Sequence, residues 1–166
     1  MIELTIATPE LMEELGARIA AQLGVGDLVQ LNGELGAGKT TLTRGLGAAL
    51  GVRGPVTSPT FVLARSHPRP NDAPLVHVDA YRLRTAVELD DLDIDFERSI
   101  VVVEWGAGLL DGITQDWLEV DIVRPRAGNQ LPGLVEGYDG PDPRTVTITG
   151  HGDRWQDLGW VGAARD

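Results

Sequence analysis

The chain of 166 residues contains no cysteine. That absence excludes disulfide bonds, thiolate metal sites and a cysteine nucleophile. The sequence also lacks any run of about 18 apolar residues, the length that a membrane-spanning helix requires. Its first residues, Met1-Ile-Glu-Leu-Thr5, carry neither the basic nor the apolar region of a signal peptide. We therefore expect no membrane segment and a cytoplasmic location, and the length fits a single domain over residues 1–166.

Positive charge is scarce. The 14 lysine and arginine residues face 25 aspartate and glutamate residues, which gives a formal net charge of −11. Proteins that bind nucleic acid extensively carry a basic face, so this balance argues against direct, extensive nucleic-acid binding. An acidic surface suits contact with a basic partner protein, although it also simply keeps a protein soluble.

The chain has a single lysine, Lys39, and this lysine lies in a phosphate-binding pattern. Residues 33–40 fit G-x-x-x-x-G-K-[ST], the P-loop. In such a loop the glycines turn backbone N–H groups toward anionic oxygens, and the following helix adds its positive N-terminal end. The ammonium group follows a phosphate as a point charge, and the hydroxyl group binds Mg²⁺. The predicted nucleotide-binding residues of this segment are Gly33, Glu34, Leu35, Gly36, Ala37, Gly38, Lys39, Thr40 and Thr41.

The neighbouring sequence supports a P-loop, which needs a buried strand before it and a helix after it. Residues 27–32 predict the strand, with apolar Leu28, Val29 and Leu31. Residues 39–50 carry apolar side chains at helical spacing, and Gly51 follows as a stop signal. The alternative is a glycine-rich turn between a strand and a helix that binds no ligand.

The other segments alternate between strand and helix patterns. A threonine and a proline at 8–9 start a helix whose predicted apolar stripe is Leu11, Leu15, Ile19 and Leu23. Strands are predicted at 2–6, 61–64, 75–78, 100–103, 118–123 and 145–148. Short helical pieces are predicted at 85–98 and a short helix or tail at 151–166. The connections are a polar segment broken by prolines at 66–74 and a mobile loop at 124–144. This alternation predicts an α/β fold, the three-layer P-loop NTPase fold, with a mostly parallel sheet and antiparallel edge strands at 118–123 and 145–148.

Two predicted strands end in a carboxylate, Asp79 after 75–78 and Glu104 after 100–103. A hydrophobic strand followed by an acid is typical of a Walker B site, whose carboxylate holds Mg²⁺ directly, holds it through water, or orients the attacking water. The alternative for either residue is an acid that faces solvent. With a P-loop in the same chain, we expect at least one of the two to be functional. Lys39, Asp79 and Glu104 are therefore the candidate catalytic residues.

Other positions say less by themselves. Residues 57–60, Thr-Ser-Pro-Thr, follow the P-loop helix, where a loop of many P-loop enzymes contacts the γ-phosphate, but the tetrapeptide alone favours an ordinary proline turn. His77 alone is typical of a hydrogen-bonded core histidine. Tyr81 and Arg82 indicate the end of a strand. Trp105 either packs near the nucleotide or fills the core.

Taken together, these segments resemble the bacterial TsaE family, the P-loop ATPases of tRNA threonylcarbamoyladenosine biosynthesis. The matching segments are Gly33-Glu-Leu-Gly-Ala-Gly-Lys-Thr-Thr41, Thr57-Ser-Pro-Thr-Phe61, His77-Val-Asp-Ala-Tyr-Arg82 and Val103-Glu-Trp-Gly106. Their order and spacing fit the family over residues 8–123. The H-x-D-x-Y-R segment joined to V-E-W is the most specific part. Residues 124–144 look longer than the family requires, and the tail also departs from its pattern.

The resemblance implies a weak Mg²⁺-dependent ATPase. It implies that Lys39 binds the phosphates of ATP and that Thr40 and Glu104 hold Mg²⁺. Asp79 would assist either the metal or the hydrolytic water, and Trp105 would lie close to the nucleotide.

The resemblance also implies a switch-like loop and partner proteins. Thr57, Ser58 and Thr60 would contact the nucleotide from that loop. The implied partners are a TsaD–TsaB pair, in which TsaD transfers threonylcarbamoyl to an adenosine beside the tRNA anticodon. ATP hydrolysis would reset this complex between turnovers, so the chain would meet tRNA only indirectly.

Two other functions stay open. A small-molecule kinase of the shikimate type has a similar length and P-loop, and Arg65, Arg69, Arg82 and Arg84 are available for an acidic substrate, although no glycine-run substrate motif follows. The second alternative is a non-catalytic, nucleotide-sensing partner subunit. A GTPase is disfavoured because its guanine-binding N-K-x-D motif needs a lysine, and Lys39 is already used.

Overall fold

The computed structural model of the protein describes residues 1–34, 36–56, 63–81, 83–105, 108–110, 113–124 and 143–162. In these ranges the strands are β1 (Ile2–Ile6), β2 (Leu28–Asn32), β3 (Ala64–Arg69), β4 (Asp72–Asp79), β5 (Ile100–Glu104), β6 (Trp117–Val123) and β7 (Arg144–His151). The α-helices are α1 (Pro9–Ala20), α2 (Lys39–Leu50) and α3 (Ala86–Asp90), followed near the C-terminus by two short 3₁₀ helices, η1 (Asp153–Trp155) and η2 (Gly159–Val161).

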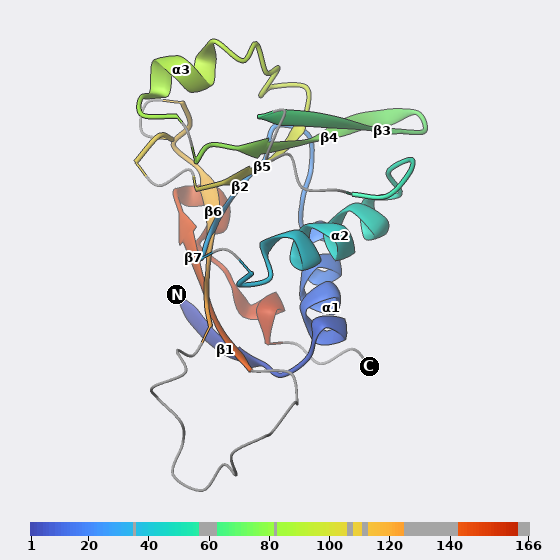
Figure 1. The fold of residues 1–166 in the computed structure, drawn as a ribbon, viewed down its shortest axis with the longest axis vertical. Helices are drawn as coiled ribbons and strands as arrows, with labels where there is room; N and C mark the ends of the chain where they lie inside the picture. The colour runs from blue at the N-terminus through green and yellow to red at the C-terminus, as the bar shows by residue number, and fades with distance from the viewer. Residues whose placement is uncertain are drawn as a thin grey trace, which may run out of the picture.

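The described strands form one sheet in the order β1-β7-β6-β2-β5-β4-β3 (Figure 1). Strands β6, β2, β5 and β4 pair in parallel, and β7, β1 and β3 are joined through antiparallel pairs. Five strands therefore run in one direction, while β3 and β7 run in the other. The predicted α/β class and mostly parallel sheet are confirmed. The assignment to the three-layer P-loop NTPase fold stays a prediction.

Helices α1 and α2 pack against each other on one face of the sheet (Figure 1). Their apolar side chains form the larger cluster with alternate residues of the central strands, such as Val29 and Leu31 of β2. The opposite face carries a second cluster, in which Leu89 of α3 packs with Val101 and Val103 of β5. Strand β5 is buried at all of its positions because both of its faces are covered.

Helix α1 begins where the sequence predicts. The backbone N–H of Leu11 donates to the Thr8 side chain at 3.2 Å, and proline occupies the first turn. The predicted apolar stripe is partly wrong, because the Leu11 side chain is 39% exposed while Met12 is buried. A period of 3.6 residues moves the buried face from Met12 to Leu15, and then to Ile19. Helix α2 ends at Gly51, which has a φ of 76°, as predicted.

The connection predicted at 66–74 is wrong, because these residues form most of a β-hairpin. Strands β3 and β4 pair antiparallel, and Asn71 turns the chain with a φ of 56°. The two prolines are tolerated for positional reasons. Pro68 lies on the edge strand, and Pro74 lies before β4 begins its parallel ladder with β5 at Leu75. Of the predicted strand 61–64, residues 61 and 62 lie outside the described residues and β3 starts at Ala64.

Strands β6 and β7 pair antiparallel, as predicted for 118–123 and 145–148, but neither is an edge. Strand β6 also pairs in parallel with β2, and β7 pairs with β1. Their alternating burial arises because alternate residues of both strands pack in the larger apolar cluster, whereas the residues between them are partly exposed. Most of the loop predicted at 124–144 lies outside the described residues. The predicted terminal helix is present as η1 and η2, and Trp155 of η1 is buried.

None of the helices in the described ranges is long and apolar enough to cross a membrane.

Glycines set the spacing between α1 and α2. A Cβ atom on Gly45 of α2 would lie 2.5 Å from the Cα of Glu13 in α1, and a Cβ on Gly16 of α1 would lie 2.7 Å from the Leu46 nitrogen. Both obstacles are backbone atoms, so a side chain would force the helices apart. The close approach brings α1 against the helix that follows the P-loop.

We predict that Gly45→Ala destabilises the protein by about 1–3 kcal/mol, as overpacking does, although alanine is the better helix former. The measurement is the free energy of unfolding in urea. Gly47→Ala on the same helix is the comparison, because its Cβ would meet side-chain atoms instead of backbone, with Val56 Cγ2 at 2.6 Å, Val52 Cγ2 at 3.3 Å and Leu75 Cδ2 at 3.6 Å, and it should therefore cost less than Gly45→Ala. A Gly45→Ala protein at least as stable as the parent would contradict the backbone contact.

Candidate functional site

The loop between β2 and α2 has a backbone that glycine permits. Gly36 has a φ of 80° and Gly38 a φ of 119°, both in the left-handed region that favours glycine. Gly33 has no room for a side chain, because a Cβ there would lie 2.8 Å from the carbonyl oxygen of Ile122. Leu35 lies outside the described residues. The loop is thus a tight glycine turn that leads directly into the helix.

Helix α2 starts without a side-chain cap, because its N-cap is Gly38. By contrast, α1 is capped by the Thr8 side chain and α3 by the Thr85 side chain. The first turn of an α-helix has N–H groups without helical partners and carries partial positive charge. In α2 these groups face the loop, where an anion would complete them.

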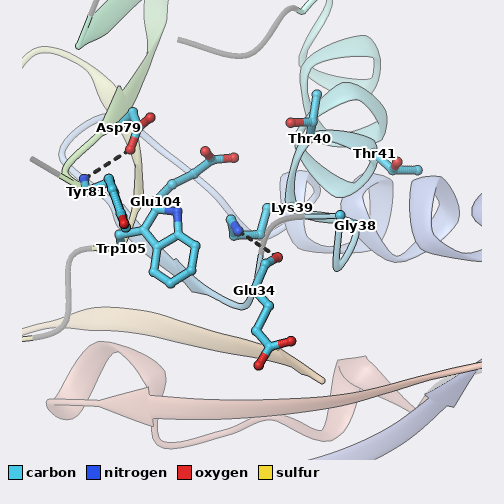
Figure 2. A pocket seen from close by; sticks show the side chains of 10 residues that line it. Glu34, Gly38, Lys39, Thr40, Thr41, Asp79, Tyr81, Glu104 and Trp105 are labelled. Atoms are coloured by element: carbon cyan, nitrogen blue, oxygen red, sulfur yellow. Dashed lines mark hydrogen bonds between the residues drawn. The ribbon is translucent and has the colours of Figure 1, made fainter. Parts of the chain in front are cut away.

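Lys39 is the first residue of α2, and its side chain bends back over the loop (Figure 2). Its Nζ donates to the carbonyl oxygens of Gly33 at 2.6 Å and Glu34 at 3.2 Å. The same ammonium lies 4.2 Å from the centre of the Trp105 ring, a cation–π contact. Burial lowers the pKa of Lys39, while the negative charges of Glu104 and Asp79 act against that shift.

Asp79 and Glu104 lie side by side at the carboxyl ends of two neighbouring parallel strands. They are direct partners in the register between β4 and β5, and both are buried, with exposed fractions of 7% and 4%. Leu75 on β4 and Val102 on β5 share their strand parity and pack in the cluster beneath α2, so both acids face the P-loop side. Asp79 Oδ1 accepts a hydrogen bond from the Tyr81 N–H at 3.0 Å, which fixes that carboxylate (Figure 2).

Two buried histidines lie behind the acids. His77 has no exposed side-chain surface, as expected for a core histidine, and its Nε2 is 3.2 Å from Glu104 Oε1. The expected hydrogen bond is not formed, because neither His77 nitrogen nor Glu104 Oε1 has a partner of hydrogen-bond geometry among the described residues. Burial, together with the charges of His77 and Arg65, lowers the pKa of His67 on β3.

Trp105 stands beside the loop rather than in the core. Its backbone has a φ of 63°, unusual for a residue other than glycine, and its N–H donates to the carbonyl oxygen of Leu31 at 2.9 Å. The ring meets that of Tyr81 edge to face, with centroids 5.5 Å apart. The sequence analysis did not predict Tyr81 as a site residue, although its position two residues after a strand-ending acid was an available signal.

These residues line one cavity of about 620 Å³ (Figure 2). The lining residues are Glu34, Gly36, Gly38, Lys39, Thr40, Thr41, Asp79, Tyr81, Glu104 and Trp105. The structure therefore brings together most of the predicted site. Ala37 lines a smaller neighbouring cavity instead. The predicted residues Thr57, Ser58 and Thr60 lie outside the described residues, as does Arg82.

The described residues contain no group of three or more histidine, cysteine or acidic side chains that would hold a metal alone. The available oxygen donors are the Thr40 hydroxyl and the carboxylates of Asp79 and Glu104. Mg²⁺ is commonly held by one or two carboxylates together with substrate phosphates and water. Glu104 Oε1, which has no hydrogen-bond partner among the described residues, also fits this chemistry. The donor set therefore fits Mg²⁺ bound with a nucleotide.

Comparison with known proteins finds similarity to one family. The family model for threonylcarbamoyl adenosine biosynthesis protein TsaE matches residues 6–130. The tRNA threonylcarbamoyladenosine biosynthesis protein TsaE of Streptomyces coelicolor is 54% identical over 148 residues, which cover 87% of this chain and 93% of that protein. The TsaE protein of Bacillus subtilis is 33% identical over 155 residues, which cover 90% and 86%.

A solved structure is also similar. The crystal structure of Bacillus subtilis YdiB superimposes with a TM-score of 0.69 at 29% sequence identity, over 93% of this chain and 88% of that one. The family match includes the P-loop, both strand-ending acids and Trp105. The chain therefore belongs to the TsaE family of threonylcarbamoyl adenosine biosynthesis proteins.

Proposed function

We propose that this protein is an Mg²⁺-dependent ATPase that serves tRNA threonylcarbamoyladenosine biosynthesis. Its family membership supports the pathway. The observation that carries the ATPase activity is the position of Lys39 in one cavity with two buried strand-ending carboxylates. We also assign the fold to the three-layer P-loop NTPases, since a strand, a glycine turn and a helix precede this site and helices lie on both faces of the sheet.

The loop and α2 would hold the phosphates. The Lys39 ammonium donates hydrogen bonds to two loop carbonyls. A bound phosphate would accept these hydrogen bonds in their place. The uncapped first turn of α2 adds backbone N–H donors and the positive end of the helix dipole. Both features suit the β- and γ-phosphates of ATP, as in other P-loop proteins.

The oxygen donors would hold the metal. Thr40 and Glu104 are the proposed Mg²⁺ ligands, with Asp79 acting on the metal or on the hydrolytic water. Mg²⁺ bound with ATP would neutralise charge on the phosphates. Because its Oδ1 accepts the Tyr81 N–H, the Asp79 carboxylate keeps one orientation, as a group that orients water requires.

The partners are proposed from the family. A TsaD–TsaB pair would bind the protein, stimulate its weak activity and contact tRNA, and the cytoplasmic location also stays a prediction. The kinase alternative is less supported, because no arginine lines the described part of the cavity. Arg69, one of its candidate residues, instead donates to the carbonyl oxygens of Leu50 and Ala73 and pairs with Asp72.

We predict that Lys39→Ala lowers ATP hydrolysis at least 10²–10³-fold, on the order expected when one electrostatic group of a site is removed. The fold should persist, because the Lys39 side chain contacts two loop carbonyls and the Trp105 ring and belongs to neither apolar cluster. Phosphate release and circular dichroism measure the two effects. Arg44→Ala removes an equal charge from an exposed position of the same helix and should leave activity unchanged. A folded Lys39→Ala protein with full activity would remove the P-loop assignment.

We predict that ATP binding changes the fluorescence of Trp105, because a phosphate that draws Lys39 away from the loop carbonyls also changes its contact with the ring. Trp105→Phe should remove most of the ATP-induced signal in a titration. Trp117→Phe is the control, since Trp117 stacks on His151 and does not line the cavity. An undiminished signal in Trp105→Phe would place the nucleotide elsewhere.

We predict that the two acids differ in effect. Glu104→Ala should weaken Mg²⁺-dependent nucleotide binding and hydrolysis, while Asp79→Ala should lower hydrolysis on the order of 10²–10⁴-fold with little loss of affinity. Titration with Mg-ATP and single-turnover rates separate the effects, each with and without the TsaD–TsaB pair. Asp72→Ala, at the other and exposed end of β4, is the control. Loss of affinity in Asp79→Ala alone would mean that the two acids have the opposite roles. Unchanged hydrolysis in both variants would mean that the two acids do not form a catalytic site.

A further inference from the structure

His77 is a buried polar group that the proposed function has not used. Its side chain has no exposed surface, and neither ring nitrogen has a hydrogen-bond partner among the described residues. Its neighbours on the same face of the sheet include Leu75 on β4 and its register partner Val102 on β5, and both are buried and apolar. An imidazole without a partner costs free energy in such surroundings, and an apolar side chain there would not. This free-energy cost suggests that His77 has a role that depends on its imidazole.

The position of His77 relative to Glu104 indicates that role. Asp79 and Glu104 are register partners, and His77 lies two residues before Asp79, so all three side chains lie on the same face of the sheet. The imidazole therefore stands one pleat behind the Glu104 carboxylate, away from the strand end that lines the cavity. Its Nε2 is 3.2 Å from Glu104 Oε1. That distance is within hydrogen-bond range, so a rotation of either planar group completes a bond.

We infer that His77 is a positioning residue, whose Nε2–H holds the Glu104 carboxylate in the orientation that binds Mg²⁺ with the nucleotide. The inference rests on the proposed function, because His77 would act through Glu104. Carboxylates that ligate metals are themselves held by hydrogen bonds from a second layer of residues, and loss of such a partner typically lowers metal affinity or activity about 10–100-fold. The donor must occupy the Nε2 position, since this is the nitrogen that faces Glu104.

Three substitutions of His77 separate positioning from packing. Gln places its amide nitrogen near the Nε2 position, Asn places it near the Nδ1 position, and Leu fills the space without a donor. The readouts are the Mg²⁺ concentration that gives half-maximal ATP hydrolysis, and the affinity for ATP with Mg²⁺ and with EDTA. We expect His77→Asn and His77→Leu to raise the Mg²⁺ requirement about 10–100-fold. We expect His77→Gln to stay close to the parent, and the affinity in EDTA to be the same in all four proteins.

The control is His67→Leu, which removes the other buried histidine of this sheet region, on the neighbouring strand β3. It should change stability without changing the Mg²⁺ requirement. If His77→Leu does not fold, the contrast between Gln and Asn still decides, because both introduce a buried amide. Equal Mg²⁺ requirements for Gln, Asn and the parent would overturn the inference while leaving a functional Glu104 in place. If Glu104→Ala instead binds Mg-ATP and hydrolyses ATP as the parent does, the proposed function is wrong, and the role of His77 with it.

Discussion

A buried ammonium group organises this site. Lys39 is 6% exposed, so its charge must be stabilised by the protein rather than by water. Two carbonyl oxygens, the face of an indole ring and two carboxylates at longer range share that task. The loop supplies the carbonyls only because its glycines permit the turn at Gly36 and Gly38. The backbone of the loop and the charge of Lys39 are therefore parts of one arrangement.

The parallel sheet supplies the rest of the arrangement. Strands β2, β5 and β4 are neighbours, so their carboxyl ends meet beside the loop. Glu104 on the middle strand pairs in register with Leu31 on one side and with Asp79 on the other. Directly after β5, Trp105 has a φ of 63°, its backbone N–H donates to the carbonyl oxygen of Leu31, and its ring lies beside the Lys39 ammonium. Helix α1 packs against α2 through close glycine contacts and holds the helix that starts at Lys39.

How much of this the sequence predicts depends on whether a feature is local. Some features depend on only a few consecutive residues. These are the glycine turn at 33–38, the helix that follows it and ends at Gly51, and the two strand-ending acids. The general rule for parallel sheets then places both acids beside the loop. The hairpin of β3 and β4 was mispredicted because the prolines are tolerated only through the positions of neighbouring strands. The interior place of β6 and β7 depends likewise on β1 and β2, which lie far away in sequence.

The contacts between side chains within the site depend on how different elements pack together, so they could not be predicted from the sequence. The stacking of Lys39 on Trp105, the edge contact of Tyr81 and the approach of His77 to Glu104 join residues from different elements. In sequence, His77 lies in the apolar segment 75–78 and His67 in the polar segment 66–74, and neither segment shows which residue of another strand lies beside it. Only the pairing of β4 with β5 shows that His77, and not His67, is the one beside Glu104.

The balance of charge explains why a metal belongs to the proposed ATP site. The cavity is lined by one cation, Lys39, and by three acidic residues, Glu34, Asp79 and Glu104. A triphosphate alone would be repelled by carboxylates in a medium of lower dielectric constant than water, where each unit-charge interaction is several times stronger. In the proposed site, a divalent cation bound with the phosphates would be attracted both to them and to the strand-ending acids. These acids would therefore favour the metal complex of the nucleotide over the nucleotide alone.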